Sequence, residues 1–146
     1  MDIIFGHLAL MIAAAFAGVA IYVSFAEQPA RLRLDDKALL TQWKPSYKRG
    51  FAMQGPLALA GCICGLIAWY EKGEGDFFWG ALLLLANWPW TLIAIMPTNN
   101  KLMRMEPADP NPEARALIKK WGALHAVRAI LGISAGIAFF FACISS

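Results

Sequence analysis

The chain has 146 residues, of which 59% are hydrophobic and 16% charged, and its formal net charge is +3. A soluble domain carries about 25% charged residues, so this composition, with a mean hydropathy of +0.52, indicates a membrane protein. The length allows one domain, residues 1–146, and excludes a separate soluble module. The basic residues gather in two loops and form no basic helix or aromatic-basic platform, which argues against nucleic acid as a partner.

The first apolar segment covers residues 3–25 and is too long for the core of a signal peptide. We therefore expect a retained transmembrane helix that stops at Pro29. Its alanine-rich middle permits close approach of another helix. Glu27 follows directly, either as an exposed loop carboxylate or as the counter-charge of an arginine within the membrane.

The loop of residues 26–50 is rich in arginine and lysine. Within it, Asp35 is placed to cap a short helix, and Pro45 either ends that helix or begins the next one. The residues between them predict that the short helix lies in the membrane interface. They include an apolar patch of Leu39, Leu40 and Trp43.

The second transmembrane segment is predicted at residues 51–70, with Gln54 near its start. Gly61 and Gly65 form a GxxxG pair, which is typical of close packing within a bundle or between chains. A short acidic link then forces an antiparallel hairpin with the third segment, residues 77–97.

The third segment carries polar and aromatic side chains toward its carboxyl end. Asn87 lies near its middle, and Trp90 is expected beside a pocket. The helix is expected to close at Pro97, two residues before Asn99 and three before Asn100.

The fourth segment, residues 121–143, follows a second basic loop, residues 98–120. An Asn-Pro-Glu sequence predicts that the helix begins near Pro112, well outside the membrane. Gly132 and Gly136 repeat the GxxxG pattern, so either glycine pair could hold a homo-oligomer together.

These segments predict an all-α, antiparallel, integral membrane four-helix bundle in the lipid bilayer. Loops 26–50 and 98–120 hold six and five basic residues, whereas the middle link holds one and the termini none. By the positive-inside rule, both loops are cytoplasmic and both termini lie outside the cell membrane.

One face of the fourth helix carries the strongest functional signal. Trp121, His125 and Arg128 are four and three residues apart, so they share that face. An arginine within a membrane segment usually faces a bundle interior or a wet cavity. We therefore expect a pocket in the cytoplasmic half of the bundle. The other helices offer it Glu27, Gln54, Asn87, Asn99 and Asn100.

The alternative to a pocket is a closed ionic network, in which Arg128 pairs with Glu27 and serves only to fix helix register. A haem held by two histidines is disfavoured because His7 and His125 lie at opposite ends of their spans. A di-iron site needs several inward glutamates and Glu-x-x-His pairs, which this chain lacks. No metal site is therefore predicted.

Two motifs carry a family resemblance: Pro-Thr-Asn-Asn-Lys-Leu at residues 97–102, and the Trp-x3-His-x2-Arg spacing at residues 121–128. With Trp88-Pro89 and Glu27-Gln-Pro29, they resemble the anthrone-oxygenase-like family of small four-helix membrane proteins. The resemblance covers nearly the whole chain. It implies the four-helix fold, a lipophilic phenolic or quinone-like ligand, and oxygenation without a metal or other cofactor.

In the chemistry that this resemblance implies, a base removes an acidic C–H from a planar phenolic substrate, and the enolate reacts directly with dioxygen. His125 would be the base, because imidazole titrates near neutral pH. Arg128 would stabilise the enolate oxygen, and Asn99 or Asn100 would hold a substrate hydroxyl. Two other functions stay open: a pocket that binds a lipid-like or quinone-like ligand without turnover, and a structural or assembly role.

Overall fold

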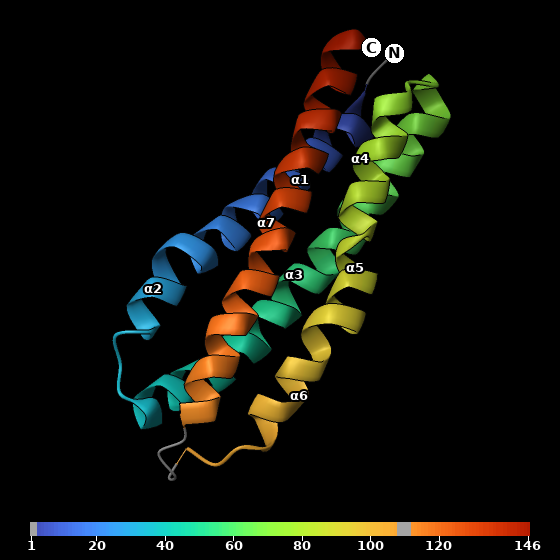
Figure 1. Ribbon diagram of the computed structural model, residues 1–146. Helices are drawn as coiled ribbons and strands as arrows, with labels where there is room; N and C mark the ends of the chain where they lie inside the picture. Colours follow the sequence, from blue (N-terminus) through green and yellow to red (C-terminus); the bar gives the residue numbers. More distant parts are fainter. Residues whose placement is uncertain (1–2, 108–111) are drawn as a thin grey trace.

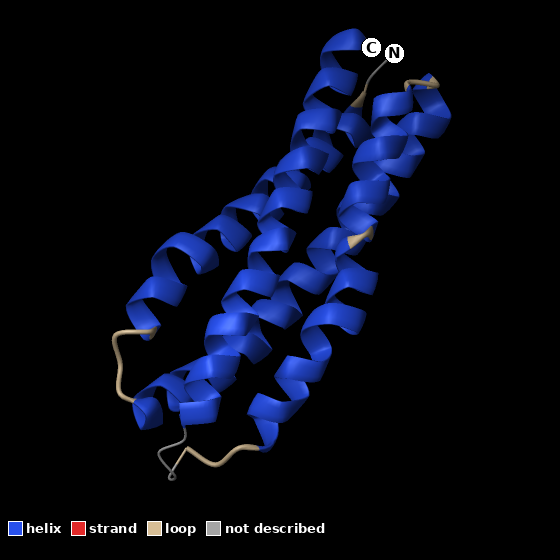
Figure 2. Ribbon diagram, viewed as in Figure 1, coloured by secondary structure: helices blue, strands red, loops and turns tan. Residues whose placement is uncertain are grey.

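The computed structural model describes residues 3–107 and 112–146, and nearly all of this part is helical (Figure 2). Four helical rods are long and apolar enough to cross a membrane. The described chain is thus an all-α, multi-pass membrane bundle, which confirms the predicted fold class. Figure 1 shows the start of α1, the end of α7 and the link between α3 and α4 at one end, here called the hairpin end. The opposite end, which carries α2 and α6, is called the basic end.

The first rod consists of α1 (Ile4–Tyr22), the π-helical turn η1 (Val23–Glu27) and α2 (Gln28–Arg31). The prediction that Pro29 stops this helix is wrong. Pro29 lies in the first turn of α2, directly after the π-helical turn. A proline lacks a backbone donor, and the first turn of a helix tolerates that loss.

The second rod is a single helix, α3 (Asp36–Lys72), with Pro45 and Pro56 inside it. Asp35 caps it, since its carboxylate accepts from the backbone N–H of Ala38 at 2.8 Å. The predicted separate interfacial helix is therefore wrong. Its apolar patch packs inside the bundle, and the stabilisation from this burial outweighs the loss of one backbone hydrogen bond at Pro45. The patch residues, Leu39, Leu40 and Trp43, cluster with Ile118 of the fourth rod.

The third rod is built from four pieces. They are α4 (Gly75–Leu85), α5 (Asn87–Trp90), the π-helical turn η2 (Thr91–Ile95) and α6 (Met96–Arg104). The turn before it uses Gly73, whose φ of 75° is the left-handed conformation that favours glycine. Pro97 does not close the rod. Like Pro29, it follows a π-helical turn and lies in the first turn of the next piece, so the helix continues.

The fourth rod is α7 (Pro112–Ser145), which begins at the predicted residue, while the predicted cap Asn111 lies outside the described residues. Its 34 residues span about 51 Å, which exceeds a hydrocarbon core of about 30 Å. Arg115 anchors the extension at the basic end. Its Nε donates to the Asp36 carboxylate at 2.5 Å, and its Nη1 to the Leu32 carbonyl at 2.9 Å.

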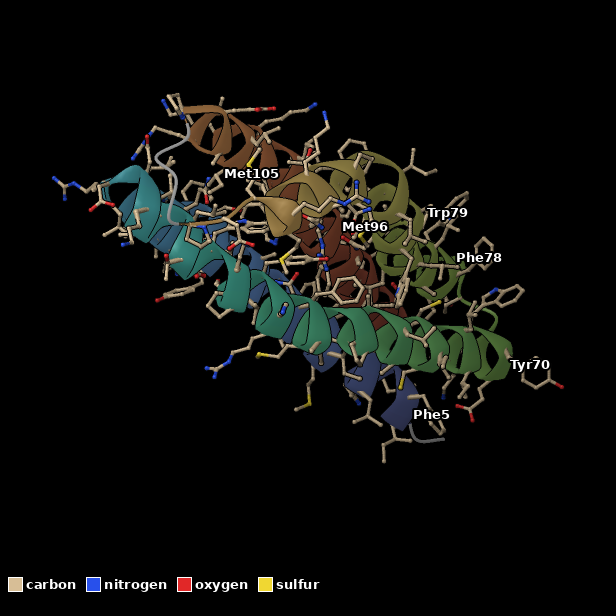
Figure 3. All side chains as sticks on the ribbon, turned by 90° about the horizontal axis from the view of Figure 1, so that it is seen from below. Phe5, Tyr70, Phe78, Trp79, Met96 and Met105 are labelled. Carbon is tan, nitrogen blue, oxygen red and sulfur yellow. The ribbon has the colours of Figure 1, made fainter. Side chains whose placement is uncertain are left out.

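The rods form a ring, in which α1 and α4 each pack against both α3 and α7. Tyr70, Phe78 and Trp79 lie at the hairpin end and Met105 at the opposite end (Figure 3). Tyr70 and Trp79 are 87% and 57% exposed, and exposed aromatic rings of this kind are typical of a membrane–water interface.

The buried interior has three zones along the bundle. The hairpin-end core is apolar and includes Phe16, Phe77, Ala81, Leu84 and Phe139. The basic-end core is also apolar and includes Leu39, Trp43, Leu102, Ile118 and Trp121. Between these cores along the rods lies a polar layer, which we define by the buried residues Gln54, Asn87, Thr91, His125 and Arg128, together with Asn99 at its basic-end margin.

Candidate functional site

The two π-helical turns lie beside the polar layer. A π-helical turn is rare, and it often marks a functional site. Here η1 contributes Val23, and η2 contributes Thr91 and Ile95, to the wall of one internal cavity. Both turns precede a proline by two residues, so the sequence breaks regular α-helical hydrogen bonding on two rods at similar depth.

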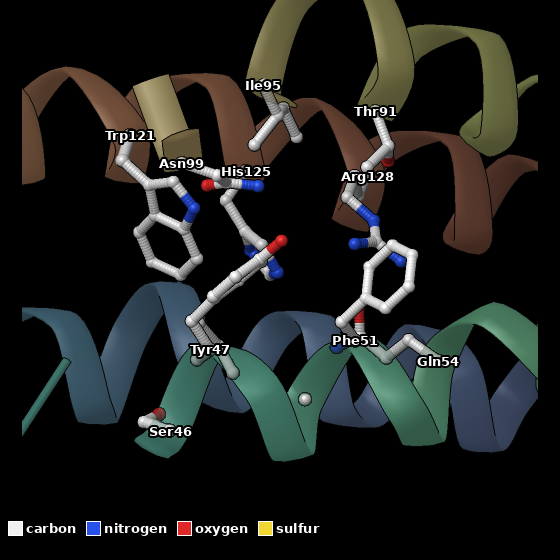
Figure 4. Close-up of a pocket in the computed structure, with 12 residues that line it drawn as sticks. Ser46, Tyr47, Phe51, Gln54, Thr91, Ile95, Asn99, Trp121, His125 and Arg128 are labelled. Atoms are coloured by element: carbon white, nitrogen blue, oxygen red, sulfur yellow. The ribbon is translucent and has the colours of Figure 1, made fainter. Parts of the chain in front are cut away.

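The cavity lies between α3 on one side and η2, α6 and α7 on the other (Figure 4). In Figure 4, Tyr47, Phe51 and Gln54 of α3 face His125 and Arg128 of α7. The wall therefore combines aromatic rings, amides, one imidazole and one guanidinium. This mixture suits a planar ligand that carries polar substituents at its edge.

The predicted face of α7 is turned into the cavity. Trp121, His125 and Arg128 all line it, and each is at most 7% exposed. The Trp121 and His125 ring centroids are 4.9 Å apart with an interplanar angle of 30°. The guanidinium carbon of Arg128 lies 5.4 Å from the centroid of the Phe16 ring, so a cation–π contact fixes the position of the charge.

Several polar atoms on the cavity wall have no hydrogen-bond partner within the described chain. They are both amide atoms of Gln54, both of Asn99, Nε1 of Trp121, Nδ1 of His125 and Nε of Arg128. Leaving one buried polar atom unpaired costs about 1–3 kcal/mol. Native proteins pair most such atoms, so the seven unpaired atoms on this wall make the cavity a candidate site for a polar ligand.

The cavity is narrow in this conformation. Its volume for the centres of water-sized spheres is about 30 Å³, enough for roughly two water molecules. A ring-bearing ligand therefore requires wall side chains to move. Tyr47 and Phe51 are only half-buried, so they are the wall rings with the most freedom to move, although the Tyr47 ring stacks on Trp43 of the basic-end core with ring centroids 5.0 Å apart.

Glu27 does not neutralise Arg128. Its carboxylate pairs with Arg31 one helical turn later and also accepts from Ser46. A third donor, Gln42, lies at 3.0 Å. Glu27 therefore lies outside the cavity, because the continuous helix through η1 and α2 brings Arg31 to it. Among the described residues, Arg128 has no ion pair, so the predicted Glu27–Arg128 lock is not found.

Three other predicted ligand residues also lie off the cavity. Asn100 is exposed, since it is rotated by about 100° from the buried Asn99. Asn87 donates its amide to carbonyls of the preceding turn at 3.2 and 3.3 Å. Trp90 donates its indole N–H to the Leu124 carbonyl at 3.0 Å, which joins the third and fourth rods.

Sequence reasoning missed two groups at the site. Tyr47 and Phe51 share a helical face with Gln54, and this spacing could have revealed them once α3 was known to be continuous. Arg31 is 2% exposed, and its guanidinium carbon lies 5.4 Å from the Trp121 ring centroid. The signal for Arg31 was its i, i+4 spacing from Glu27.

The chemistry that this arrangement offers is proton transfer at an imidazole, charge stabilisation at a guanidinium, hydrogen bonding by amides and stacking on aromatic rings. Across residues 3–107 and 112–146, no three His, Cys, Asp or Glu side chains gather where they could hold a metal ion. The three cysteines are free: Cys62 is buried, and Cys64 and Cys143 are half-buried.

Comparisons with a family sequence pattern and with individual known proteins identify the same family. The sequence pattern of the family described as anthrone oxygenase matches residues 43–138, which include every cavity residue except Val23. The chain is 32% identical over 114 residues to an anthrone oxygenase of Claviceps purpurea, covering 70% of this chain and 66% of the relative. It is 30% identical to monooxygenase hypC of Dothistroma septosporum, covering 68% and 60% of the two chains.

A third relative is anthrone oxygenase tpcL of Aspergillus fumigatus, at 31% identity over 68% of this chain and 66% of the relative. The chain thus spans 60–66% of the length of these relatives. No solved structure matches the chain. The matched region and the curated relatives agree, and the chain belongs to the anthrone oxygenase family.

Proposed function

We propose that this protein is a membrane oxygenase that oxidises a planar, lipophilic phenol of the anthrone type in the cavity of the polar layer. Membership of the family supports the reaction class. The observation that carries the assignment to this cavity is the set of unpartnered polar atoms on its wall, above all Nδ1 of His125 and Nε of Arg128. They lie one helical turn apart on the same face of α7.

In the proposed reaction, Nδ1 of His125 takes a proton from the acidic methylene carbon opposite the substrate carbonyl. The electron pair moves onto the carbonyl oxygen, and Arg128 stabilises this enolate. The carbanionic carbon then bonds dioxygen, and the peroxide takes up a proton. Loss of water leaves a second carbonyl, so one CH2 and one O2 become one C=O and one H2O. The chain's own groups need supply only proton transfer and charge stabilisation.

The remaining wall groups would orient the substrate. The amides of Gln54 and Asn99 are buried and unpartnered, so each can accept from or donate to a phenolic hydroxyl. Trp121 and Tyr47 offer ring faces for stacking. Each hydrogen bond to the substrate would offset the desolvation penalty of one buried polar atom. The cavity should therefore bind a ligand with several oxygen atoms more tightly than a hydrocarbon of the same size.

We also propose that the protein spans the cell membrane with its basic end in the cytoplasm and both termini outside. Lys44, Lys101, Arg104, Arg115 and Lys119 all belong to the basic end, and cytoplasmic loops carry such an excess of positive charge. Homo-oligomer formation stays a prediction. Within one chain, Gly65 already packs against Phe139, whereas Gly136 faces open space.

The test is oxygen uptake by the purified protein in lipid nanodiscs, with an anthrone as substrate and the protein-free rate subtracted. Arg128→Met keeps an unbranched side chain and removes the charge, and we expect roughly a 100- to 1,000-fold lower rate. Arg104→Met is the matched control, because Arg104 is exposed outside the cavity. Equal rates for wild type and Arg128→Met would refute the proposal. Tight binding of an anthraquinone without oxygen uptake would instead indicate a non-catalytic binding protein.

A further inference from the structure

The cavity is closed in both directions along the bundle axis. Toward the hairpin end, Phe16 and Leu84 are fully buried in the apolar core. Toward the basic end, Trp43, Leu102 and Ile118 are also fully buried. Protein interiors of this kind are close-packed. A ligand therefore has to reach the cavity from the side, between two rods.

A groove between the first rod and α3 leads to the cavity. Its volume is about 420 Å³, and three residues line both the groove and the cavity: Val23, Ser46 and Gly50. Gly50 lies where the groove and the cavity meet. A Cβ atom added there would meet no atom within 4 Å, so the space that a side chain would occupy is open.

The outer part of the groove has the character of a membrane–water boundary. Its rim carries Tyr22 and Met53, which are 62% and 56% exposed, and the exposed Arg49. The carboxylate of Glu27, paired with Arg31, also lines the groove. A lining that combines apolar, aromatic and charged side chains matches an aromatic molecule that carries polar substituents at one edge and partitions to the interface.

We propose that this groove is a lateral portal, through which the planar phenolic substrate passes from the membrane interface into the cavity, and that Gly50 sets its width. The identity of the ligand rests on the proposed function, whereas the route rests on the continuity of groove and cavity. The helix needs no glycine at this position for its backbone conformation, because Gly50 lies within regular α-helix. The glycine matters here because the absence of a side chain leaves the passage open.

Two other recesses fit the role less well. The groove between α1 and α7 is larger, about 510 Å³, but shares no residue with the cavity. Gln28 lies across it against Gly122, with its amide bonded to the Ile118 carbonyl at 2.8 Å. The recess between Phe51 and Trp88 touches the cavity, but its volume of about 10 Å³ barely admits one water.

The first test measures access to the cavity without any need for turnover. Ile95→Cys places a thiol at a buried position that lines the cavity and neither groove. The thiol is labelled with N-phenylmaleimide and, separately, with the much smaller methyl methanethiosulfonate, and the modified peptide is quantified by mass spectrometry. The ratio of the two rates corrects for the reactivity of the thiol itself.

We expect Gly50→Leu to lower this ratio at least about tenfold, because the leucine side chain fills the junction. Gly18→Leu is the matched control: Gly18 lies on the first rod, is exposed and also has no atom within 4 Å of an added Cβ. If Gly50→Leu does not fold, Gly50→Ala should show a smaller fall in the same direction. An unchanged ratio, or an equal fall in Gly18→Leu, overturns the portal.

The second test compares oxygen uptake with a three-ring anthrone and with the smaller two-ring 1-naphthol, whose keto tautomer has the same methylene opposite a carbonyl. Gly50→Leu should reduce kcat/KM for the anthrone at least about tenfold more than for 1-naphthol. An equal reduction for both substrates contradicts a width-setting role of Gly50. Absence of oxygen uptake by wild type would refute the proposed reaction, and the labelling ratio would still decide the route.

Discussion

The hairpin-end core and the polar layer are formed by the same four rods but differ in how closely their side chains pack and in whether their polar atoms are paired. In the hairpin-end core, large rings fill the spaces left by small residues. A Cβ added to Gly65 or Gly80 would come within 2.7 or 2.5 Å of the Phe139 ring. In the polar layer, the helices contain π-helical turns, and buried amide, imidazole and guanidinium atoms lack partners. The hairpin-end core is closely packed between helices, whereas the polar layer contains buried polar atoms that make no hydrogen bond within the described chain.

Under the proposed function, this difference lets a chain of 146 residues combine a stabilising core with a reactive layer. Within a bilayer, helices associate through close packing and interhelical hydrogen bonds, so the tightly packed hairpin-end core contributes cohesion between the rods. The unpartnered atoms of the polar layer each carry a cost of about 1–3 kcal/mol, which a ligand of the proposed kind would offset. Such a division is the usual compromise between stability and activity.

The largest effect is expected at the imidazole. His125→Phe keeps the ring stacked near Trp121 and removes the base, so turnover should fall roughly 100- to 10,000-fold. Thermal unfolding in detergent should occur at the same or a higher temperature, because Nδ1 no longer lies buried without a partner. His7→Phe, at an exposed position on α1, is the control and should keep full activity.

A complementary effect is expected in the hairpin-end core. Phe139→Ala opens a cavity beside Gly65 and Gly80 and should lower the free energy of unfolding by about 3 kcal/mol. The exposed Phe141→Ala, with 51% of its surface accessible, should cost far less. Unfolding curves in mixed micelles measure both. Similar losses for the two variants would contradict a tightly packed core at this end.

A smaller effect is expected where the two zones meet. Phe16 belongs to the hairpin-end core, and its ring also lies against the Arg128 guanidinium. Phe16→Leu should slow turnover about fivefold, equivalent to about 1 kcal/mol of cation–π contact. In an Arg128→Met background the same change should have little further effect on the rate. A full fivefold loss there would show that the ring acts independently of the charge.

The fold was largely predictable from the sequence, since four apolar runs, an acidic link and two basic loops determine a four-helix bundle. Helix lengths were not. Pro29, Pro45 and Pro97 each predicted a boundary, but all three lie inside longer rods. Two follow π-helical turns, and the third lies in a segment held by buried packing of Trp43. Helix propensity predicts correctly that a proline disfavours an α-helix. It contains no information about the tertiary contacts that can outweigh this local preference.

The candidate site was half predictable. The spacing of Trp121, His125 and Arg128 identified one wall of the cavity, because helical periodicity survives any change in helix length. The opposite wall was obscured because Tyr47 fell in a region assigned as a loop. Glu27 was misplaced for the same reason, since a helix ending at Pro29 would not bring Arg31 to its carboxylate.

Under the proposed function, the polar layer exists for a ligand and not for the stability of the fold. Gln54 tests it most directly, because both of its amide atoms are buried and unpartnered and the side chain is 1% exposed. In Gln54→Met, which preserves side-chain volume, we expect an unfolding temperature equal to or above that of wild type, together with slower anthrone oxidation. A lower unfolding temperature with undiminished oxygen uptake would contradict it.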